Sequence, residues 1–358
     1  MPSTVPTSAS GSTGVELIFL GTGTSSSIPH VDCLTYDPAI QSPCKTCLCT
    51  LKPEGKKNIR RNTGVVLRMK AKDGRSVTIV IDAGKTFQAA AVEWFPKFGL
   101  RRIDALLITH AHADAMNGLD DLRGWTLNGA IQPSIDVYLT QDTFTEVQRS
   151  FPYLVSKEFA SGGGDVPDFK YHIINDRESF EIQGTGIEIT PFAVHHGRIF
   201  SKQKVGVIHP LLCLGFKIQE QLAYISDVSH IPDHVWELLR SNRRGTSSGP
   251  LPALILDCLR LRPHPSHLGI ADSIKIARRV GAIKTYLTGF SHDVAHEEYV
   301  TITEAVGGAV KGDKALSESE RNGIVLVQGS QQLWVRPAFD GLRLFVSEDG
   351  NVHDECYY

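Results

Sequence analysis

The sequence predicts an α/β protein in which two β-sheets pack face to face and helices cover their outer sides. Short runs rich in β-branched and aromatic residues, bounded by Gly, Pro, Asp or Asn, recur along the chain and are typical of strands. Segments with helical periodicity lie between these runs. Strands gather over residues 15–83 and 184–227, with helices inserted around them, and this grouping favours a layered arrangement.

The expected strands are residues 15–23, 63–69, 77–84, 103–114, 135–140, 171–175, 187–194, 212–218, 222–227, 253–257, 285–290 and 333–337. The expected helices are residues 86–98, 142–155, 232–241 and 270–280. Polar stretches at 161–168 and 241–252 predict flexible surface loops. Residues 1–14 have low complexity and are expected to be disordered, so residues 15–358 are interpreted as a single domain.

The composition excludes some functional classes. Lys and Arg total 37 against 39 Asp and Glu, a formal charge of −2, which argues against a protein built around a nucleic-acid backbone. It leaves room for a local basic patch. The chain has no apolar run of about 18 residues and no recognisable signal peptide, so we expect no membrane span and a cytoplasmic location, with a nuclear one also open.

The strongest functional motif follows a buried strand. The segment LLITHAHADAMNGLDDLR places His110, His112 and Asp114 two residues apart, so an extended chain would point all three to one side. Two imidazoles and a carboxylate suit a divalent cation such as zinc. The motif predicts a metal site, and the alternative is a polar loop with incidental histidines.

Further candidate residues also follow strands. Asp82, Asp227, the pair His195 and His196, and His292 each stand at or just beyond the end of an expected strand. A site assembled from several strand ends is typical of enzymes, because the scaffold beneath it is rigid.

The cysteines predict a second metal site. Seven is an odd number and no export signal is visible, so a disulfide framework is not expected. The segment 33–49 holds Cys33, Cys44, Cys47 and Cys49, and its Cys-x-x-Cys pattern favours structural zinc. The alternative is reduced cysteines packed as small hydrophobes.

Together these motifs resemble the metallo-β-lactamase superfamily of metal-dependent hydrolases, whose signature is H-x-H-x-D-H. The chain carries Gly21–Ser25, Asp82-Ala83-Gly84, the His-x-His-x-Asp core, a later Val-x-His-Gly, a Ser-Asp after a strand and a final His. The segment Ala338–Leu342 is similar to the one that closes many members, and the early cysteines with Arg60–Thr63, Gly118–Arg123 and Pro265–Leu268 are similar to one branch. That branch contains the phosphonate-pathway cyclic phosphodiesterase and is akin to the tRNA 3′-processing endonucleases. The resemblance implies a four-layer αβ/βα sandwich of two mixed sheets.

The resemblance also implies roles for the residues at strand ends. His110, His112 and His196 would bind a first metal, Asp114 and His292 a second, and Asp227 would bridge the two. His196 is preferred to His195 because it precedes Gly197. Asp82 would orient a ligand imidazole through its free N–H, or would simply be a strand-end turn residue.

One position departs from the signature. Ala115 stands where the pattern has His, so the second metal would keep Asp114, Asp227 and His292. We therefore expect one or two catalytic ions, with zinc, manganese and iron all acceptable, and Asp114 as a catalytic residue.

The cysteine cluster has a counterpart in the same branch. By resemblance, Cys33, Cys44, Cys47 and His296 would hold one structural zinc, with Cys49 as an alternative to Cys33.

The expected reaction is hydrolysis of a small phosphodiester, including 2′,3′- or 1,2-cyclic esters, by metal-activated water. His267 would be the general acid, with His264 as the alternative. Gly21–Ser25, Arg60 and Arg61 are weaker candidates for phosphate contacts, and the two arginines could equally be solvated. Alternatives are a tRNA 3′-end endoribonuclease and a non-catalytic metal-binding protein. The expected partner is a small phosphodiester, RNA is less favoured, and the resemblance allows a homodimer.

Overall fold

The computed structural model describes residues 14–160, 165–199, 209–240, 243–244, 247–309, 315–329 and 331–355. The disordered tail expected over residues 1–14 lies, except for Gly14, outside the described residues, as do parts of the two loops expected to be flexible. In the described part of the chain, no helix has both the length and the apolar character that crossing a membrane requires.

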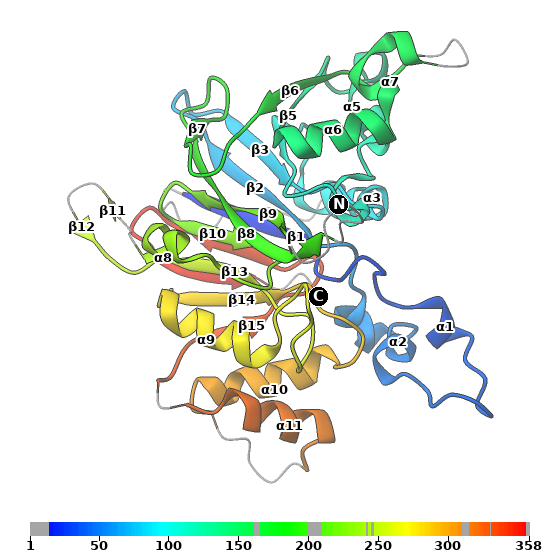
Figure 1. Cartoon of the computed structure of the whole chain (residues 1–358), viewed down its shortest axis with the longest axis vertical. Coiled ribbons are helices and arrows are strands. Elements are labelled where there is room, and N and C mark those ends of the chain that lie inside the picture. Colours follow the sequence, from blue (N-terminus) through cyan, green and yellow to red (C-terminus); the bar gives the residue numbers. More distant parts are fainter. Residues whose placement is uncertain are drawn as a thin grey trace, which may run out of the picture.

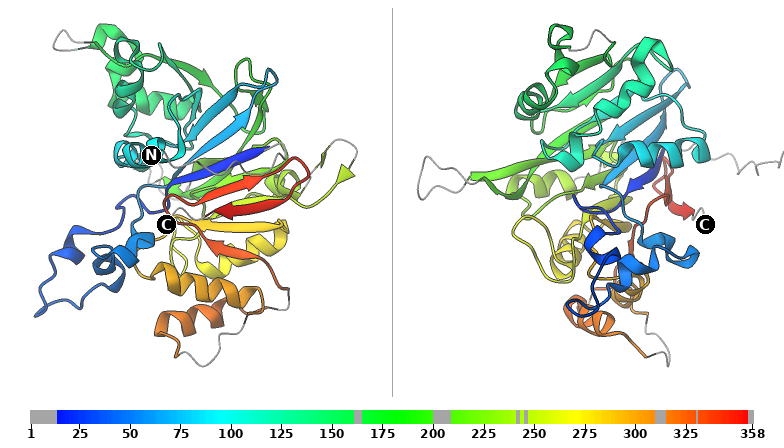
Figure 2. Two further views of the ribbon diagram at one scale, coloured as in Figure 1. Left: turned by 180° about the vertical axis from the view of Figure 1, so that it is seen from behind. Right: turned by 90° about the vertical axis from the view of Figure 1, so that its right-hand side faces the viewer.

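Two mixed β-sheets form the centre of the molecule, as Figures 1 and 2 show. The first has the order β17(Val352–Glu355), β16(Arg343–Val346), β1(Val15–Gly21), β2(Gly64–Lys70), β3(Ser76–Ile81), β4(Ala105–Leu107), β5(Ile135–Leu139), β6(Phe169–Ile173). The second has the order β15(Val335–Pro337), β14(Lys284–Thr288), β13(Ala253–Asp257), β10(Leu222–Ile225), β9(His209–Ile218), β8(Glu188–Ile199), β7(Phe180–Glu181). A separate ribbon pairs β11(Arg243–Arg244) with β12(Ser247–Ser248).

The alternation of side chains along a strand explains why both faces of each sheet are covered. In β1, Leu17 and Phe19 belong to the core between the sheets, whereas Ile18 and Leu20 pack under the helices outside the first sheet. A strand buried on both faces reads as a continuous apolar run, which is what residues 15–20 show apart from Glu16.

Helices cover the outer faces. The first sheet packs against α3(Phe87–Phe98), α5(Arg123–Thr126), α6(Gln141–Ser150) and α7(Pro152–Val155). The second packs against α8(Asp233–Arg240), α9(Ile270–Val280), α10(His296–Val306) and α11(Glu318–Val327). The predicted sandwich of two sheets between helical layers is therefore confirmed.

Some elements differ from the sequence-based expectation. The helix expected over 142–155 is two helices, because Phe151 precedes Pro152 and adopts a non-helical conformation with φ −135°. Residues 31–58, within a region expected to be mostly strand, form α1(Val31–Leu34), α2(Lys45–Cys49) and a 3₁₀ turn at Pro53–Asn58. This cysteine-bearing segment extends away from the sheets (Figure 1).

The sheets meet where β4 ends. The backbone N–H of Leu214 in β9 donates to the carbonyl of Thr109, two residues beyond β4. On the second sheet β10, β13 and β14 run parallel, so the residues after all three strands lie at the same edge. This shared edge carries the candidate site.

Candidate catalytic metal centre

Three imidazoles converge at this edge. His110 and His112 lie in the short segment between β4 and α4(Ala113–Met116), and His196 comes from β8. Their ring centroids are 4.5 Å apart for His110 and His112, 5.0 Å for His110 and His196, and 5.1 Å for His112 and His196. One nitrogen of each ring lies within 4.8 Å of the other two. The structure thus brings together the three residues expected at the first metal.

Hydrogen bonds behind the rings fix which nitrogen faces the centre. Nδ1 of His196 lies 2.8 Å from the carbonyl oxygen of Ser266, which can only accept, so Nδ1 carries the proton and Nε2 keeps its lone pair. Nε2 of His196 faces Nδ1 of His112 at 3.3 Å. Nε2 of His110 is buried without a hydrogen-bond partner. Nitrogen lone pairs that converge on one point are what a divalent cation requires, so these residues fit a metal.

Asp82 supports His110 through an intermediate residue. Its carboxylate accepts the backbone N–H of Thr109 at 2.8 Å and the Thr109 hydroxyl at 2.9 Å. That hydroxyl lies 2.8 Å from Nδ1 of His110. The direct contact expected between Asp82 and a ligand imidazole is therefore replaced by a relay, because Thr109 occupies the space between them.

His195 and His196 take opposite directions. His196 is 4% exposed and faces the other two imidazoles, whereas the ring of His195 lies 5.2 Å from that of His230. Gly197 allows the close approach of the His196 backbone to the loop before α9, since a Cβ there would lie 2.9 Å from Cβ of Ser266 and φ is +73°.

Two carboxylates border the three imidazoles. Asp227 follows β10, and one of its oxygens lies within 4.8 Å of donor atoms on His110 and, separately, on His196 and His267. Burial opposes its ionisation, but the neighbouring imidazoles His196, His110 and His267 lower the pKa of Asp227 to about 2. Asp114 lies in the first turn of α4 and, with His112 and His196, lines a cavity that opens over the imidazoles. Burial and the charge of Asp227 raise the pKa of Asp114.

The expected second metal keeps few ligands. Ala115 is buried in α4, and its carbonyl accepts the backbone N–H of Ala83 at 2.8 Å. The residue that directly follows β14 is Gly289, where an added Cβ would meet Oδ1 of Asp257 at 2.6 Å. His292, expected to bind this metal, points elsewhere. Of the residues expected to bind a second ion, Asp227 lies beside the imidazoles and Asp114 lines the cavity above them, whereas His292 lines the cavity but turns its Nδ1 to the thiols.

His267 lies beside the three imidazoles and against a buried acid. Its ring centroid is 4.8 Å from that of His196, and its Nδ1 lies 3.1 Å from Oδ2 of Asp257. Asp257, the last residue of β13, is fully buried and also accepts the backbone N–H of Leu268 at 3.1 Å. Burial disfavours the imidazolium, but the charge and hydrogen bond of Asp257 outweigh it and raise the pKa of His267 to about 9. The buried carboxylate of Asp257 thus favours the protonated form of His267 next to the three imidazoles.

Three thiols gather around His292, whereas His296 is the histidine expected beside them. Nδ1 of His292 lies 3.2 Å from Sγ of Cys33, 3.7 Å from Cys44 and 3.6 Å from Cys47. A zinc ion bound tetrahedrally would set sulfur–nitrogen separations of roughly 3.5 Å, so this group fits zinc. Cys49 instead donates to the carbonyl of Thr46 at 3.0 Å, so it does not replace Cys33.

His296, the residue expected with these thiols, lies in the core. It begins α10, is 4% exposed, and its ring is 5.2 Å from that of Phe339. Its backbone N–H donates to Asn58 at 2.8 Å. Entry into the helix turns its side chain inward, whereas His292 lies in the loop that passes over the cysteine segment.

A buried arginine braces that loop. Arg60 is 1% exposed and donates to the carbonyls of Ser291 and Val294, the latter at 3.0 Å. Arg61 bonds to Glu93 at 2.6 Å, and its backbone N–H donates to Asp340 at 2.9 Å. The hypothesis that these arginines contact phosphate is therefore not supported for Arg60, whose guanidinium is used internally.

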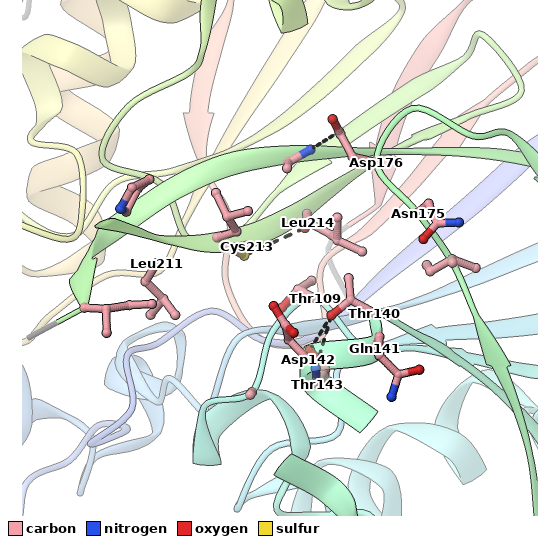
Figure 3. A pocket seen from close by; sticks show the side chains of 16 residues that line it. Thr109, Thr140, Gln141, Asp142, Thr143, Asn175, Asp176, Leu211, Cys213 and Leu214 are labelled. Carbon is pink, nitrogen blue, oxygen red and sulfur yellow. Dashed lines mark hydrogen bonds between the residues drawn. The ribbon is translucent and has the colours of Figure 1, made fainter. Parts of the chain in front are cut away.

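A cavity of about 480 Å³ opens over the imidazoles. Its walls include the hydroxyls of Thr24 and Ser25, the loop with His264 and His267, and the segment 291–293. A second cavity, of about 380 Å³, lies behind Thr109 and Cys213 and is drawn in Figure 3. Sγ of Cys213 lies 3.6 Å from Nδ1 of His110. The second cavity therefore lies on the Nδ1 side of this ring, away from the Nε2 atom that faces the other imidazoles.

The sequence analysis did not single out Asp257, Thr109 or Arg260 as site residues. Arg260 lines the cavity of about 480 Å³. Asp257 could have been found, since it ends an expected strand as Asp82 and Asp227 do. Thr109 and Arg260 carry no comparable signal, because a single threonine or arginine after a strand is common.

Comparison with known proteins shows which family and which solved structures the chain is similar to. A model of the beta-lactamase superfamily domain matches residues 77–290. A solved diphosphatase from the PhnP family is 25% identical with a TM-score of 0.61, covering 92% of this chain and 97% of that one. Unliganded yeast PDE1 has the same fold with a TM-score of 0.55 at 13% identity, covering 93% and 100%.

One curated relative is named for acyl transfer and not for hydrolysis of a phosphate compound. An octanoyltransferase of Porphyromonas gingivalis strain W83 is 27% identical over 299 residues, which are 80% of this chain and 48% of that protein. The chain thus spans about half the length of the curated relative it matches.

Proposed function

Because the chain belongs to the beta-lactamase superfamily and has its metallohydrolase fold, we propose that it is a metal-dependent phosphodiesterase acting on a small phosphodiester. The observation that carries this proposal is His267, hydrogen-bonded to the buried Asp257 and directly beside three imidazoles whose lone pairs face one centre. A cation site next to a proton donor is the pairing that ester hydrolysis uses.

The ion would be held by Nε2 of His110, Nδ1 of His112 and Nε2 of His196, with Asp227 beside them. When bound, it would supply Lewis acidity at a phosphoryl oxygen and an activated water. We propose one tightly held ion, since Ala115 and Gly289 leave Asp114 and Asp227 without an imidazole from α4 or β14. Zinc, manganese and iron all suit these donors.

His267 would donate the proton that the leaving oxygen needs. Asp257 holds the imidazolium in place, and backbone N–H groups from Leu268 and Val228 hold Asp257. Because both partners are anchored to strand and helix ends, the donor is preorganised. His264 lines the same cavity but is exposed and bonds Ser266 at 2.9 Å, which favours His267.

Cavity size and charge support a small substrate. A cavity of about 480 Å³ falls in the range of small-molecule sites, and the formal charge of −2 argues against a protein built around a nucleic-acid backbone. The solved diphosphatase at 25% identity supports a phosphate-containing compound as the substrate class.

A structural zinc at Cys33, Cys44, Cys47 and His292 completes the proposal. His30 links this site to the cavity, since its ring stacks on that of His292 at 4.0 Å and both residues line the cavity wall. The zinc would thereby stiffen the mouth of the catalytic site.

The test is a substrate panel on protein whose metal content is measured. Bis(p-nitrophenyl) phosphate, 2′,3′-cyclic nucleotides, a nucleoside diphosphate ester, a thioester, a lactone and a precursor tRNA are compared by kcat/KM. We expect turnover of the small phosphate diesters, the nucleoside diphosphate ester included, above that of the thioester, the lactone and the precursor tRNA. A far higher kcat/KM on precursor tRNA would contradict the small-substrate proposal and favour an endoribonuclease, and metal binding without turnover of any ester would favour a binding protein.

A further inference from the structure

Arg260 brings an unused positive charge into the catalytic cavity. It lies three residues beyond β13 and lines the cavity together with His264 and His267. Its Nε atom is buried without a hydrogen-bond partner, and no ion pair or hydrogen bond joins its guanidinium to another described residue. Unpartnered buried donors are rare in folded proteins, and they are common where a ligand supplies the acceptor.

The backbone of Arg260 is held from two sides. Its carbonyl accepts the N–H of Ile270 at 3.0 Å, at the start of α9. The preceding Leu259 exchanges bonds with both cavity walls, since its N–H donates to Leu268 at 3.0 Å and its carbonyl accepts from Ser291 at 2.8 Å. The guanidinium is therefore carried by a fixed segment between the loop of His267 and the loop of His292.

Other arginines near the site differ in this respect. The guanidinium groups of Arg60 and Arg61 donate hydrogen bonds to carbonyls and carboxylates within the protein. Arg262, two residues further along, is exposed and does not line the cavity. Among the arginines of this region, Arg260 combines a position in the cavity with free donors.

We propose that Arg260 binds a second phosphoryl group of the substrate, so that the preferred substrate is a diphosphate ester with one phosphorus at the metal centre and the other at Arg260. Guanidinium presents paired N–H donors that match two phosphate oxygens, and it keeps its charge at every physiological pH. Thr24 and Ser25 line the same cavity, and a hydroxyl is a group that can donate to phosphate oxygens. This inference rests on the proposed function for the identity of the reacting centre.

The test compares Arg260→Gln and Arg260→Lys with the matched control Arg262→Gln in metal-loaded protein. Calorimetry measures binding of inorganic pyrophosphate and of orthophosphate. Arg260→Gln should weaken the affinity for pyrophosphate at least tenfold. It should change the affinity for orthophosphate less than twofold, because orthophosphate needs the metal centre alone. Arg260→Lys should fall between, since an ammonium keeps the charge without the paired geometry. Arg262→Gln should match the wild type.

Kinetics give the second readout. KM for a nucleoside diphosphate ester should rise about tenfold in Arg260→Gln, whereas KM for bis(p-nitrophenyl) phosphate, which has one phosphorus, should stay within twofold. Equal losses for both substrates, or equal binding of pyrophosphate by wild type and variant, would overturn the subsite. If pyrophosphate binding depends on Arg260 but no ester is hydrolysed, the subsite stands and the proposed function fails. If Arg260→Gln does not fold, the same comparisons apply to Arg260→Lys.

Discussion

Nδ1 of His292 lies 3.2 Å from Sγ of Cys33 and belongs to the thiol cluster, although the residue stands just beyond a strand that ends at the catalytic edge. His292 and His296 are four residues apart, and the fold sends one to the thiols and the other into the core. The pair therefore offers a direct comparison.

His292→Ala should remove about one zinc per chain and lower the free energy of unfolding by about 3 kcal/mol or more, because metal binding is coupled to folding of the cysteine segment. His296→Ala should keep this zinc. Elemental analysis and denaturant unfolding check both variants. If His292→Ala kept the zinc and His296→Ala lost it, His296 would be the zinc ligand and the assignment to His292 would be wrong.

His267→Ala should lower kcat by about 10²–10⁴ on esters with poor leaving groups and much less on p-nitrophenyl esters, with metal content unchanged. A poor leaving group needs the proton that His267 carries, and p-nitrophenolate does not. Asp257→Asn should show the same pattern more weakly. His264→Ala, on the same cavity wall, is the control and should keep most of the activity. Equal losses for both kinds of leaving group would rule out a proton donor.

Stability should fall in mild acid because of His296. Burial, with the charges of Arg60 and Lys57, lowers the pKa of His296 to about 3. In the unfolded chain a histidine titrates near 6.5, so between these values the unfolded state binds a proton that the folded state excludes. The free energy of unfolding therefore decreases as pH falls below about 6.5.

From pH 6.5 to 5.5 this histidine should cost about 1 kcal/mol of stability. Over that interval, the free energy of unfolding should fall by about 1 kcal/mol less in His296→Gln than in the wild type. Denaturant titration at each pH measures this difference. The exposed His353→Gln controls for removal of a histidine. Identical slopes for wild type and His296→Gln would show that the buried imidazole does not contribute.

The sequence predicted the features that depend on local pattern. Residues 103–114 and 222–227 are predicted as strands, and β4 and β10 occupy Ala105–Leu107 and Leu222–Ile225 within them. Polar residues directly after buried strands gather at a sheet edge, which is why the sequence points to His110, His112 and Asp227. The choice of His196 over His195 agrees with the direction its ring takes in β8.

Features that depend on loop paths could not be read from the sequence. Whether His292 or His296 meets the cysteines is decided by where α10 begins, and by Arg60, which holds the loop from a segment more than 200 residues away. The same holds for Thr109, whose place between Asp82 and His110 follows from a backbone N–H bond. The unpaired state of Arg260 is a property of the assembled cavity.

The most direct test uses the neighbours His195 and His196. Wild-type protein should contain about two ions per chain, one at the three imidazoles and one at the thiols, and should hydrolyse a small phosphodiester. His196→Ala should retain about one ion and lose turnover, whereas His195→Ala should keep both ions and the wild-type rate. Undiminished turnover by His196→Ala, or loss of metal from His195→Ala alone, would contradict the catalytic centre described above.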